Sequence, residues 1–334
     1  MRITPELLHK NARDTVAQRT RSDRDILAVY LHGSLLGEEP LLGGTADIDL
    51  FFIHHEKVEK AREIVRLTDE VHLDITHHVR DDYRWARALR LHPWLGPTMF
   101  NCKIMYDPQH FLDFTQASVR GQFDQPDNVI GRARGQAEHA RQIWFSLHDL
   151  TAEPTEVEIN LYLRSIVHAA NAVVSLSGMP LTERRFLVRF PARAEAAGHP
   201  GLYQGLLGLL GAPNVEQERL SDWLTKWQVA YQAIPQSAVT ARLHPDRFFY
   251  YQRGINSLIN SQQPHNALWP LLRNWTHVIQ VLPHEKELLE NWREAFQGLG
   301  IYGAEFRERV SALDAYLDTV EEILDDWARA NGVE

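Results

Sequence analysis

Short apolar runs separated by polar segments characterise the first hundred residues of the chain. Residues 26–32 (Ile-Leu-Ala-Val-Tyr-Leu-His) form one such run and lead into Gly33-Ser34, which is typical of a buried strand that enters a turn. Residues 71–76 alternate between apolar and polar side chains, as a half-buried strand does. The pattern predicts strands over 26–32, 47–53, 71–76 and 103–106. It predicts helices over 5–19, 56–67 and 81–91.

The pattern changes after about residue 107, because no further stretch has the period of a strand. Apolar residues instead recur at helical spacing, and Gly and Pro separate the amphipathic stretches from one another. Helices are predicted at roughly 130–150, 155–177, 181–197, 215–233, 246–262, 268–281, 285–297 and 303–330.

The two patterns together predict the fold class and the domains. With 334 residues the chain is about twice the length of a typical domain. We expect an α+β domain with a small mixed sheet over residues 1–120, followed by an all-α helical bundle over residues 121–334.

Three aspartates stand out within the predicted strands. Asp47 and Asp49 are two positions apart on one strand, so both point to the same face, with Cα atoms roughly 6.6 Å apart. On the next strand Asp74 shares a face with His72 and Thr76, while the opposite face is apolar. Mg²⁺ prefers a few carboxylates together with water and phosphate oxygens. The three aspartates are therefore a candidate metal site.

The turn after the first strand adds a candidate phosphate site. Gly33 has no Cβ, so the backbone can approach a phosphate closely there. Ser34 offers a hydroxyl group and backbone amides where the chain leaves the strand. Each feature alone is common in turns and strands, and the joint order of turn, Asp-x-Asp and third Asp favours a functional site.

The order His32-Gly33-Ser34, Asp47-Ile48-Asp49-Leu50 and Asp74 resembles the signature of the nucleotidyltransferase superfamily typified by DNA polymerase β. The resemblance covers roughly residues 25–80. A helical second half entered through a helix over 160–177 is similar to the antibiotic adenylyltransferases of the streptomycin/spectinomycin type.

The resemblance implies a nucleotidyltransferase that moves AMP, or another nucleoside monophosphate, from ATP or another nucleoside triphosphate to a hydroxyl group of a small molecule. Asp47, Asp49 and Asp74 would be the catalytic residues and the ligands of two Mg²⁺ ions. Gly33, Ser34 and Arg184 would bind the nucleotide. By the same analogy Glu156, Glu158 or Asn160 of the helical half, and Arg184 or Arg185, would face the cleft. Asp74 or a glutamate on the 155–160 helix would act as the general base.

Composition and charge indicate which classes of binding partner are expected. The 35 Lys and Arg residues against 44 Asp and Glu residues give a net charge of −9, which argues against a nucleic-acid partner. Residues 1–120 have 16 basic and 18 acidic side chains, and residues 121–334 have 19 and 26, so the second half carries −7. This excess favours a cationic, aminoglycoside-like acceptor.

With one cysteine, no apolar leader and no membrane span in the sequence, we expect a cytoplasmic protein without a membrane partner.

Two other functions fit parts of the pattern. One is a non-catalytic regulator that binds a nucleotide without turnover, and the other is a nucleoside monophosphate transferase that acts on a protein. The pairs His54-His55 and His77-His78 suggest zinc at first sight. Adjacent residues on a strand point to opposite faces, however, and no cysteine ligand accompanies them. We interpret these histidines as strand-end residues.

Overall fold

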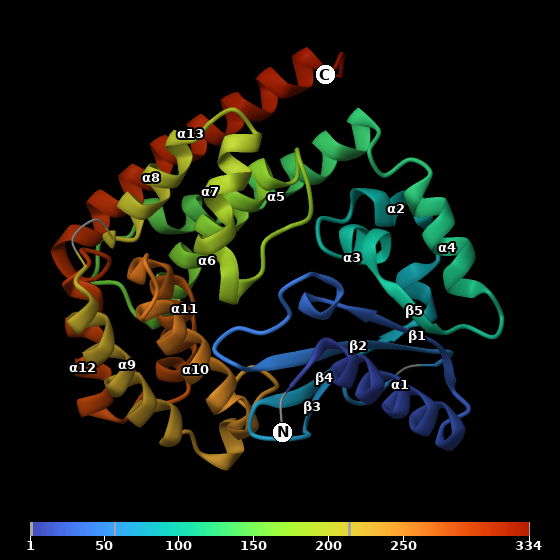
Figure 1. The fold of residues 1–334 in the computed structure, drawn as a ribbon. Coiled ribbons are helices and arrows are strands. Elements are labelled where there is room, and N and C mark those ends of the chain that lie inside the picture. Colours follow the sequence, from blue (N-terminus) through green and yellow to red (C-terminus); the bar gives the residue numbers. More distant parts are fainter. Residues whose placement is uncertain (1–2, 57, 213–214, 334) are drawn as a thin grey trace. The chain divides into compact units, whose positions relative to one another are not determined.

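A computed structural model describes residues 3–56, 58–212 and 215–333 of the chain (Figure 1). The chain divides into two compact units. The first unit comprises Met1–Asp124 and Thr240–Gly254, and the second comprises Gln125–Val239 and Ile255–Glu334. The hydrophobic pattern gives no sign that 240–254 returns to the first unit, and a boundary at residue 120 stays a prediction.

The first unit contains a small mixed sheet, as the sequence predicts, and this sheet has five strands where the pattern predicted four. Their order is β3-β4-β2-β1-β5. β2 and β4 run parallel, whereas the other neighbouring pairs are antiparallel. The strands are β1 (Ile26–His32), β2 (Ala46–His54), β3 (Arg62–Arg66), β4 (Val71–Val79) and β5 (Lys103–Tyr106).

The predicted helix over 56–67 is wrong, because residues 62–66 form the edge strand β3. Its Ile64 is buried, while Arg62 and Arg66 at its two ends are exposed. Charged side chains are common on edge strands, where they discourage pairing with another chain. This composition made the segment similar to a charged surface helix.

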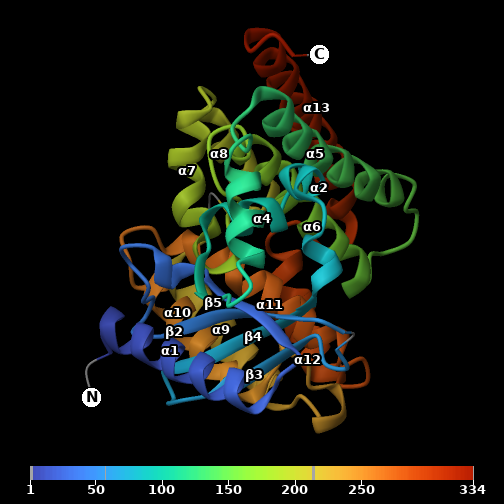
Figure 2. The same ribbon diagram turned by 90° about the vertical axis from the view of Figure 1, so that its right-hand side faces the viewer.

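One face of the sheet packs against α1 (Pro5–Ser22), as Figures 1 and 2 show. Leu8, Ala12 and Val16 recur every fourth residue and form the buried stripe of α1. They pack against alternate residues of β2 and β4, namely Ala46, Ile48, Leu50 and Phe52 together with Val71, Leu73 and Ile75. This core leaves the intervening residues of both strands on the opposite face of the sheet.

The rest of the first unit's N-terminal part is built from short helices. The predicted helix over 81–91 consists of two pieces, a 3₁₀ turn η2 (Arg80–Tyr83) and helix α2 (Ala86–Leu91). Two helices that the sequence pattern did not predict follow, α3 (Leu95–Asn101) and α4 (Phe111–Arg120).

The second unit is helical, as predicted. Its long helices α5, α6 and α13 lie side by side (Figures 1 and 2). The helices from residue 125 onward are α5 (Pro126–His148), α6 (Glu156–Val174), α7 (Phe186–Ala196), α8 (Gly201–Leu209), α9 (Gln217–Gln232), α10 (Phe248–Ile259), α11 (Leu268–Gln280), α12 (Lys286–Gln297) and α13 (Phe306–Ala330). Only α8 lies outside the predicted helices. α10 begins in the first unit and ends in the second.

The returning segment 240–254 contacts a tight hairpin turn between β1 and β2. Leu42 and Thr45 exchange backbone hydrogen bonds of 3.1 Å in both directions, and Gly43 and Gly44 between them have φ values of +58° and +73°. Both glycines therefore adopt the left-handed conformation of this turn type. A Cβ on Gly43 would lie 2.2 Å from the carbonyl oxygen of Arg253, whereas a Cβ on Gly44 would meet nothing within 4 Å.

We predict that Gly43→Ala loosens the returning segment while Gly44→Ala does not. Each alanine costs about 1–2 kcal/mol for its positive φ, and Gly43→Ala adds roughly 1–3 kcal/mol for the clash with the backbone. Urea unfolding should show this difference. Limited trypsin digestion should cut within 240–254 faster in Gly43→Ala alone, and equal digestion of the two variants would contradict the prediction.

Candidate metal centre

The three aspartates that the sequence singled out lie together. Asp47, Asp49 and Asp74 each place a carboxylate oxygen within 4.8 Å of the other two. Asp49 on β2 is directly opposite Asp74 on β4 in the parallel register. Asp47 and Asp74 are buried, and Asp49 is partly buried. We call these residues the carboxylate triad.

The alternation of the strands explains this arrangement. Ile48 and Leu73 turn toward the core under α1, so the aspartates next to them turn to the opposite face. Neighbouring strands lie about 4.8 Å apart, which brings side chains of directly opposite residues into contact. The spacing of residues within each strand predicted which side chains share a face. The parallel pairing of β2 with β4 brings the aspartates of the two strands together.

The Gly33-Ser34 turn lies against the triad. Gly33 has a φ of +85°, and a Cβ there would lie 1.9 Å from Oδ2 of Asp49. Glycine is therefore required both by the backbone conformation and by the close approach to the carboxylate. Ser34 begins a short 3₁₀ turn, η1 (Ser34–Leu36), and its hydroxyl donates to the carbonyl of Pro40 at 3.3 Å.

Two arginines that the sequence analysis did not identify contact the triad. Arg62 of β3 donates from Nε to Oδ1 of Asp74 at 2.6 Å and from Nη2 to Oδ2 at 2.5 Å. This is a bidentate pair, the strongest common geometry between a guanidinium and a carboxylate. Arg62 fell within the segment that the pattern assigned wrongly to a helix, so its position beside Asp74 could not be inferred.

Arg247 is the second arginine and comes from the returning segment. It ends the 3₁₀ turn η6 (Pro245–Arg247), and its guanidinium donates to Oδ2 of Asp74 at 3.0 Å and to Oδ2 of Asp47 at 3.2 Å. The residue is only 5% exposed. Its Cζ lies 5.0 Å from the ring centre of Tyr250 and 5.5 Å from that of Tyr251. No local sequence signal indicates this contact between residues 200 positions apart.

The electrostatics of the triad favour a bound cation. Burial, with the neighbouring charges of Asp47 and Asp74, raises the pKa of the Asp49 carboxyl well above its ordinary value. The opposing effects of Arg247 and Arg62 are smaller. Carboxylate oxygens at this spacing are hard ligands of the kind that divalent cations take. The residues therefore fit a metal ion, and Arg247 would compete for two of the ligand oxygens.

The other predicted site residues belong to the second unit. Arg184 lies in the 3₁₀ turn η3 (Glu183–Arg185), and its role in nucleotide binding stays a prediction. Glu158 is hydrogen-bonded to Thr155 at the N-terminus of its own helix, and the bonds from Thr155 outweigh burial and lower the pKa of Glu158. Asn160 accepts a hydrogen bond of 2.7 Å from Nη1 of Arg273.

Two of the histidines that the sequence analysis interpreted as strand-end residues, His54 and His77, contact each other. Nε2 of His54 lies 2.9 Å from Nδ1 of His77, and Nε2 of His77 lies 3.3 Å from a carboxylate oxygen of Glu63. Burial lowers the pKa of His77. Among the described residues, the triad is the one cluster of three or more such ligands close enough to hold a metal ion.

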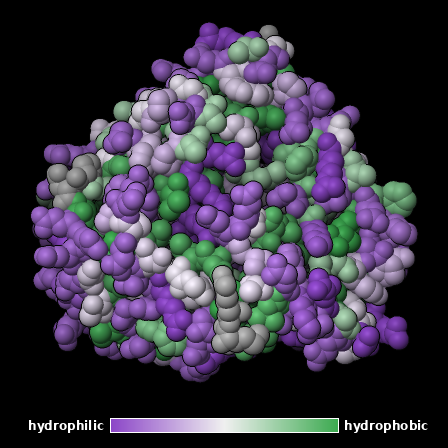
Figure 3. Space-filling view, in the orientation of Figure 1, coloured by the Kyte–Doolittle hydropathy of each residue, from purple (hydrophilic) through white to green (hydrophobic). Residues whose placement is uncertain are grey.

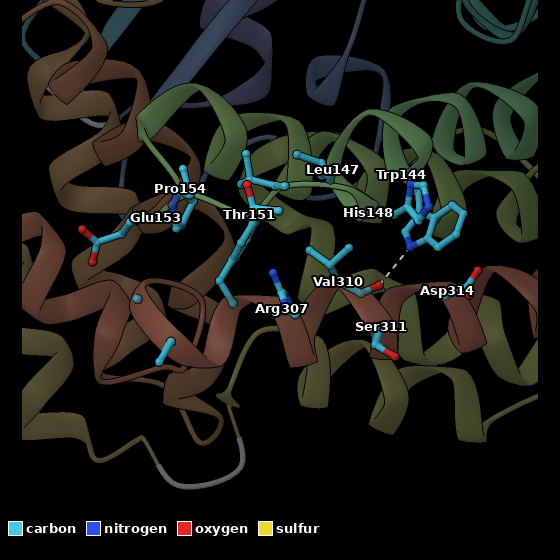
Figure 4. A pocket seen from close by; sticks show the side chains of 15 residues that line it. Trp144, Leu147, His148, Thr151, Glu153, Pro154, Arg307, Val310, Ser311 and Asp314 are labelled. Atoms are coloured by element: carbon cyan, nitrogen blue, oxygen red, sulfur yellow. Dashed lines mark hydrogen bonds between the residues drawn. The ribbon is translucent and has the colours of Figure 1, made fainter.

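A separate pocket of about 500 Å³ lies within the second unit (Figure 4). It is lined by the end of α5, by residues 150–154 and by the start of α13. The indole of Trp144 donates to the carbonyl of Val310 at 3.0 Å, and Asp314 at the rim is paired with Arg141. None of the triad residues lines this pocket.

Comparison with protein-family models and with curated proteins gives no match for this chain. On the face drawn in Figure 3, hydrophilic side chains are interspersed with small hydrophobic groups. Within the described ranges, no helix combines the length and the apolar character needed to cross a membrane.

We predict that Arg247→Gln strengthens the binding of a divalent cation. At a distance of about 5 Å and an effective dielectric constant near 20, the repulsion that is removed is roughly 3 kcal/mol for each unit of charge on the ion, so the dissociation constant for Mn²⁺ should fall at least about a hundredfold. Electron paramagnetic resonance of free Mn²⁺ would measure it. Arg253→Gln, which removes a partly exposed ion pair with Glu70 in the same segment, is the matched control. Unchanged Mn²⁺ affinity in Arg247→Gln would show that the guanidinium does not compete.

We also predict that His32 contributes to the pH dependence of stability. Burial lowers the pKa of His32 to about 4, and its Nδ1 is inaccessible and has no partner among the described residues. Because the folded pKa is depressed, the neutral form stabilises the fold above pH 6.5, and this contribution is lost as the pH falls toward 4. From pH 7.5 to 5 it should decrease by about 2 kcal/mol. In metal-free urea titrations, His32→Gln should lose that part of the pH dependence, and an unchanged pH profile would contradict this.

Proposed function

We propose that this protein is a metal-dependent nucleotidyltransferase that moves AMP from ATP to a hydroxyl group of a small molecule and releases pyrophosphate. The observation that carries the proposal is the carboxylate triad on two parallel neighbouring strands, with Gly33 packed against Asp49. The same elements in the same order form the signature of the nucleotidyltransferase superfamily, which the sequence resembles.

Each residue of the site would have its own role in such a reaction. Asp47 and Asp49, on one strand, would hold metal jointly, and Asp74 would complete the site from β4. The Gly33-Ser34 turn would place backbone amides and a hydroxyl group beside the triphosphate. Two Mg²⁺ ions, when bound, neutralise the triphosphate and lower the pKa of the acceptor hydroxyl group.

The contacts of Asp74 limit how many further partners this carboxylate can take, whether as metal ligand or as general base. Both of its oxygens accept hydrogen bonds from Arg62, and Oδ2 also accepts one from Arg247. These three donors occupy three of the roughly four lone-pair positions of the carboxylate, so one position stays open to a metal ion or to the proton of the acceptor. Of the glutamates near residue 155, Glu158 is engaged with Thr155 at the N-terminus of its own helix.

One observation favours the second candidate function, a regulator that binds nucleotide without turnover. Arg62 and Arg247 already neutralise Asp74, and a permanent arginine could replace a catalytic metal. The presence of all three carboxylates favours catalysis, since a simple nucleotide-binding site does not need both metal positions. Binding of ATP without transfer of its α-phosphate to any acceptor would identify the regulator.

The test begins with the nucleotide. Mg²⁺ with ATP should raise the melting temperature, as a ligand selective for the native state must, and neither component alone should do so fully. ATP labelled at the α-phosphate should then label a small-molecule fraction of a cell extract and release pyrophosphate. A labelled protein fraction would reassign the acceptor. The absence of both a thermal shift and a labelled product would overturn the proposal.

We predict that substitutions in the triad separate binding from turnover. Asp49→Asn should weaken Mg²⁺-dependent ATP binding and abolish transfer together, because Asp49 acts in the ground state as well as the transition state. Asp74→Asn should keep most ATP affinity and lose turnover by several orders of magnitude. Calorimetry of ATP binding beside kcat measures this difference. Asp81→Asn, on the exposed η2 turn, is the control. Near-normal turnover in Asp74→Asn would exclude Asp74 from the site.

A further inference from the structure

The inner face of the α5–α6 hairpin in the second unit is lined by basic and amide side chains. The two helices are antiparallel neighbours, and the hydroxyl of Ser165 on α6 donates to the carbonyl of Ala140 on α5 at 2.9 Å. Spacings of three and four residues place side chains on one face of each helix. Together with one residue of α11 they form a group that we call the basic cluster: Arg132, Gln136, His139, Arg164, His168 and Arg273.

The contacts within the basic cluster join its members to one another. Nη2 of Arg164 donates to Nε2 of His139 at 3.3 Å. Nδ1 of His168 lies 2.5 Å from Oε1 of Gln136, and the two imidazole rings meet edge to face with centres 4.3 Å apart. Among the described residues, His139 is the one hydrogen-bond partner of Arg164. This guanidinium therefore faces an imidazole and no carboxylate.

Two further guanidinium groups of the cluster are nearly inaccessible to solvent. Arg132 is 3% exposed and Arg273 is 8% exposed. Arg273 donates to Asn160 of α6 at 2.7 Å. Burial, and to a smaller extent the positive charges of Arg164 and Arg273, lower the pKa of His168 to about 4. The local field is therefore positive.

The cluster also contains a hydrogen-bond donor that nothing described satisfies. Gln136 is 1% exposed, and its Nε2 has no partner among the described residues. Buried amide groups are almost always paired, so an unpaired one is typical of a position that a ligand or water completes. Its donor lies within the same positive field, which makes an anion the matching partner.

Basic residues on the outer side of α5 show the contrast. Arg134 pairs with Asp325, and Arg141 pairs with Asp314, Asp318 and Glu321, all on α13. These arginines have acidic partners within the protein. The acidic residue nearest to the cluster along α5, Glu138, is exposed and accepts from Gln142. Arg164 on the inner face has no such acidic counterpart in the part of the chain that the structure describes.

We propose that the basic cluster binds a ligand through its phosphate group. Guanidinium groups present several donors in a fixed plane that matches phosphate oxygens, and the Gln136 amide adds a neutral donor. Arg164 and the two histidines are partly exposed, so a ligand can reach them from solvent. The proposal stands on the second unit alone and does not rest on the nucleotidyltransferase proposal.

The test measures the binding of inorganic pyrophosphate to the full chain by calorimetry in EDTA, so that no divalent cation contributes. We expect binding that weakens as ionic strength rises. Arg164→Gln should raise the dissociation constant at least tenfold, since a charge-assisted hydrogen bond is lost. Arg164→Lys should restore part of the affinity. Arg134→Gln, which removes an exposed arginine paired with Asp325, should leave the affinity unchanged.

Two outcomes would overturn the proposal. One is the absence of pyrophosphate binding by the unsubstituted chain, and the other is an equal loss of affinity in Arg164→Gln and Arg134→Gln. Circular dichroism and melting temperature exclude a folding defect, and Arg164→Lys remains informative if Arg164→Gln does not fold. Competition by metal-free ATP would identify a nucleotide as the source of the phosphate, and competition by ribose 5-phosphate alone would identify an acidic acceptor. Asp49→Asn should bind pyrophosphate normally, which separates this site from the triad.

Discussion

The mutual repulsion of three carboxylates is the constraint on which the first unit depends. Asp47, Asp49 and Asp74 have ligand oxygens within 4.8 Å of one another on one face of a small sheet. Charges of one sign in such a space are tolerated only when cations compensate them. Arg62 and Arg247 supply compensation from two different parts of the chain, an edge strand and a segment that follows helices α5 to α9. The return of 240–254 to this unit therefore has an electrostatic reason as well as a packing one.

The sequence predicted the ligands of this site better than their surroundings. The period of two along β2 indicated that Asp47 and Asp49 point to the same face of the sheet. The period along β4 indicated that Asp74 points away from the apolar face of its strand. The hydrophobic core under α1 confirms both predictions. The sequence could not predict the parallel pairing that sets Asp49 beside Asp74, because pairing depends on the whole sheet. The edge strand β3 was wrongly predicted as a helix, since its charges conceal a buried Ile64. Arg247 could not be found at all, because no local pattern reports a contact 173 residues away from Asp74.

In the second unit, the sequence predicted the helices well and the local charge poorly. Helical periodicity predicted all of its long helices, because each buries one stripe of apolar residues and local spacing reveals that stripe. Net charge was less informative. The balance of −7 over residues 121–334 is a sum, and many of its acidic side chains lie on α13, where they neutralise Arg134 and Arg141. The inner face between α5 and α6 has the opposite sign around Arg164, so the total charge gave no guide to the local field.

The interruption of the first unit affects how the protein is made. Its sheet and α1 are encoded within the first 124 residues, but the segment that supplies Arg247 ends at Gly254. During synthesis on the ribosome, the residues of the sheet emerge early. Arg247, the second arginine beside the carboxylates, emerges only when about three quarters of the chain has been synthesised. Residues 1–124 alone therefore lack one of the two arginines that compensate the three carboxylates, so transferring only this segment by gene fusion would leave the carboxylates without Arg247.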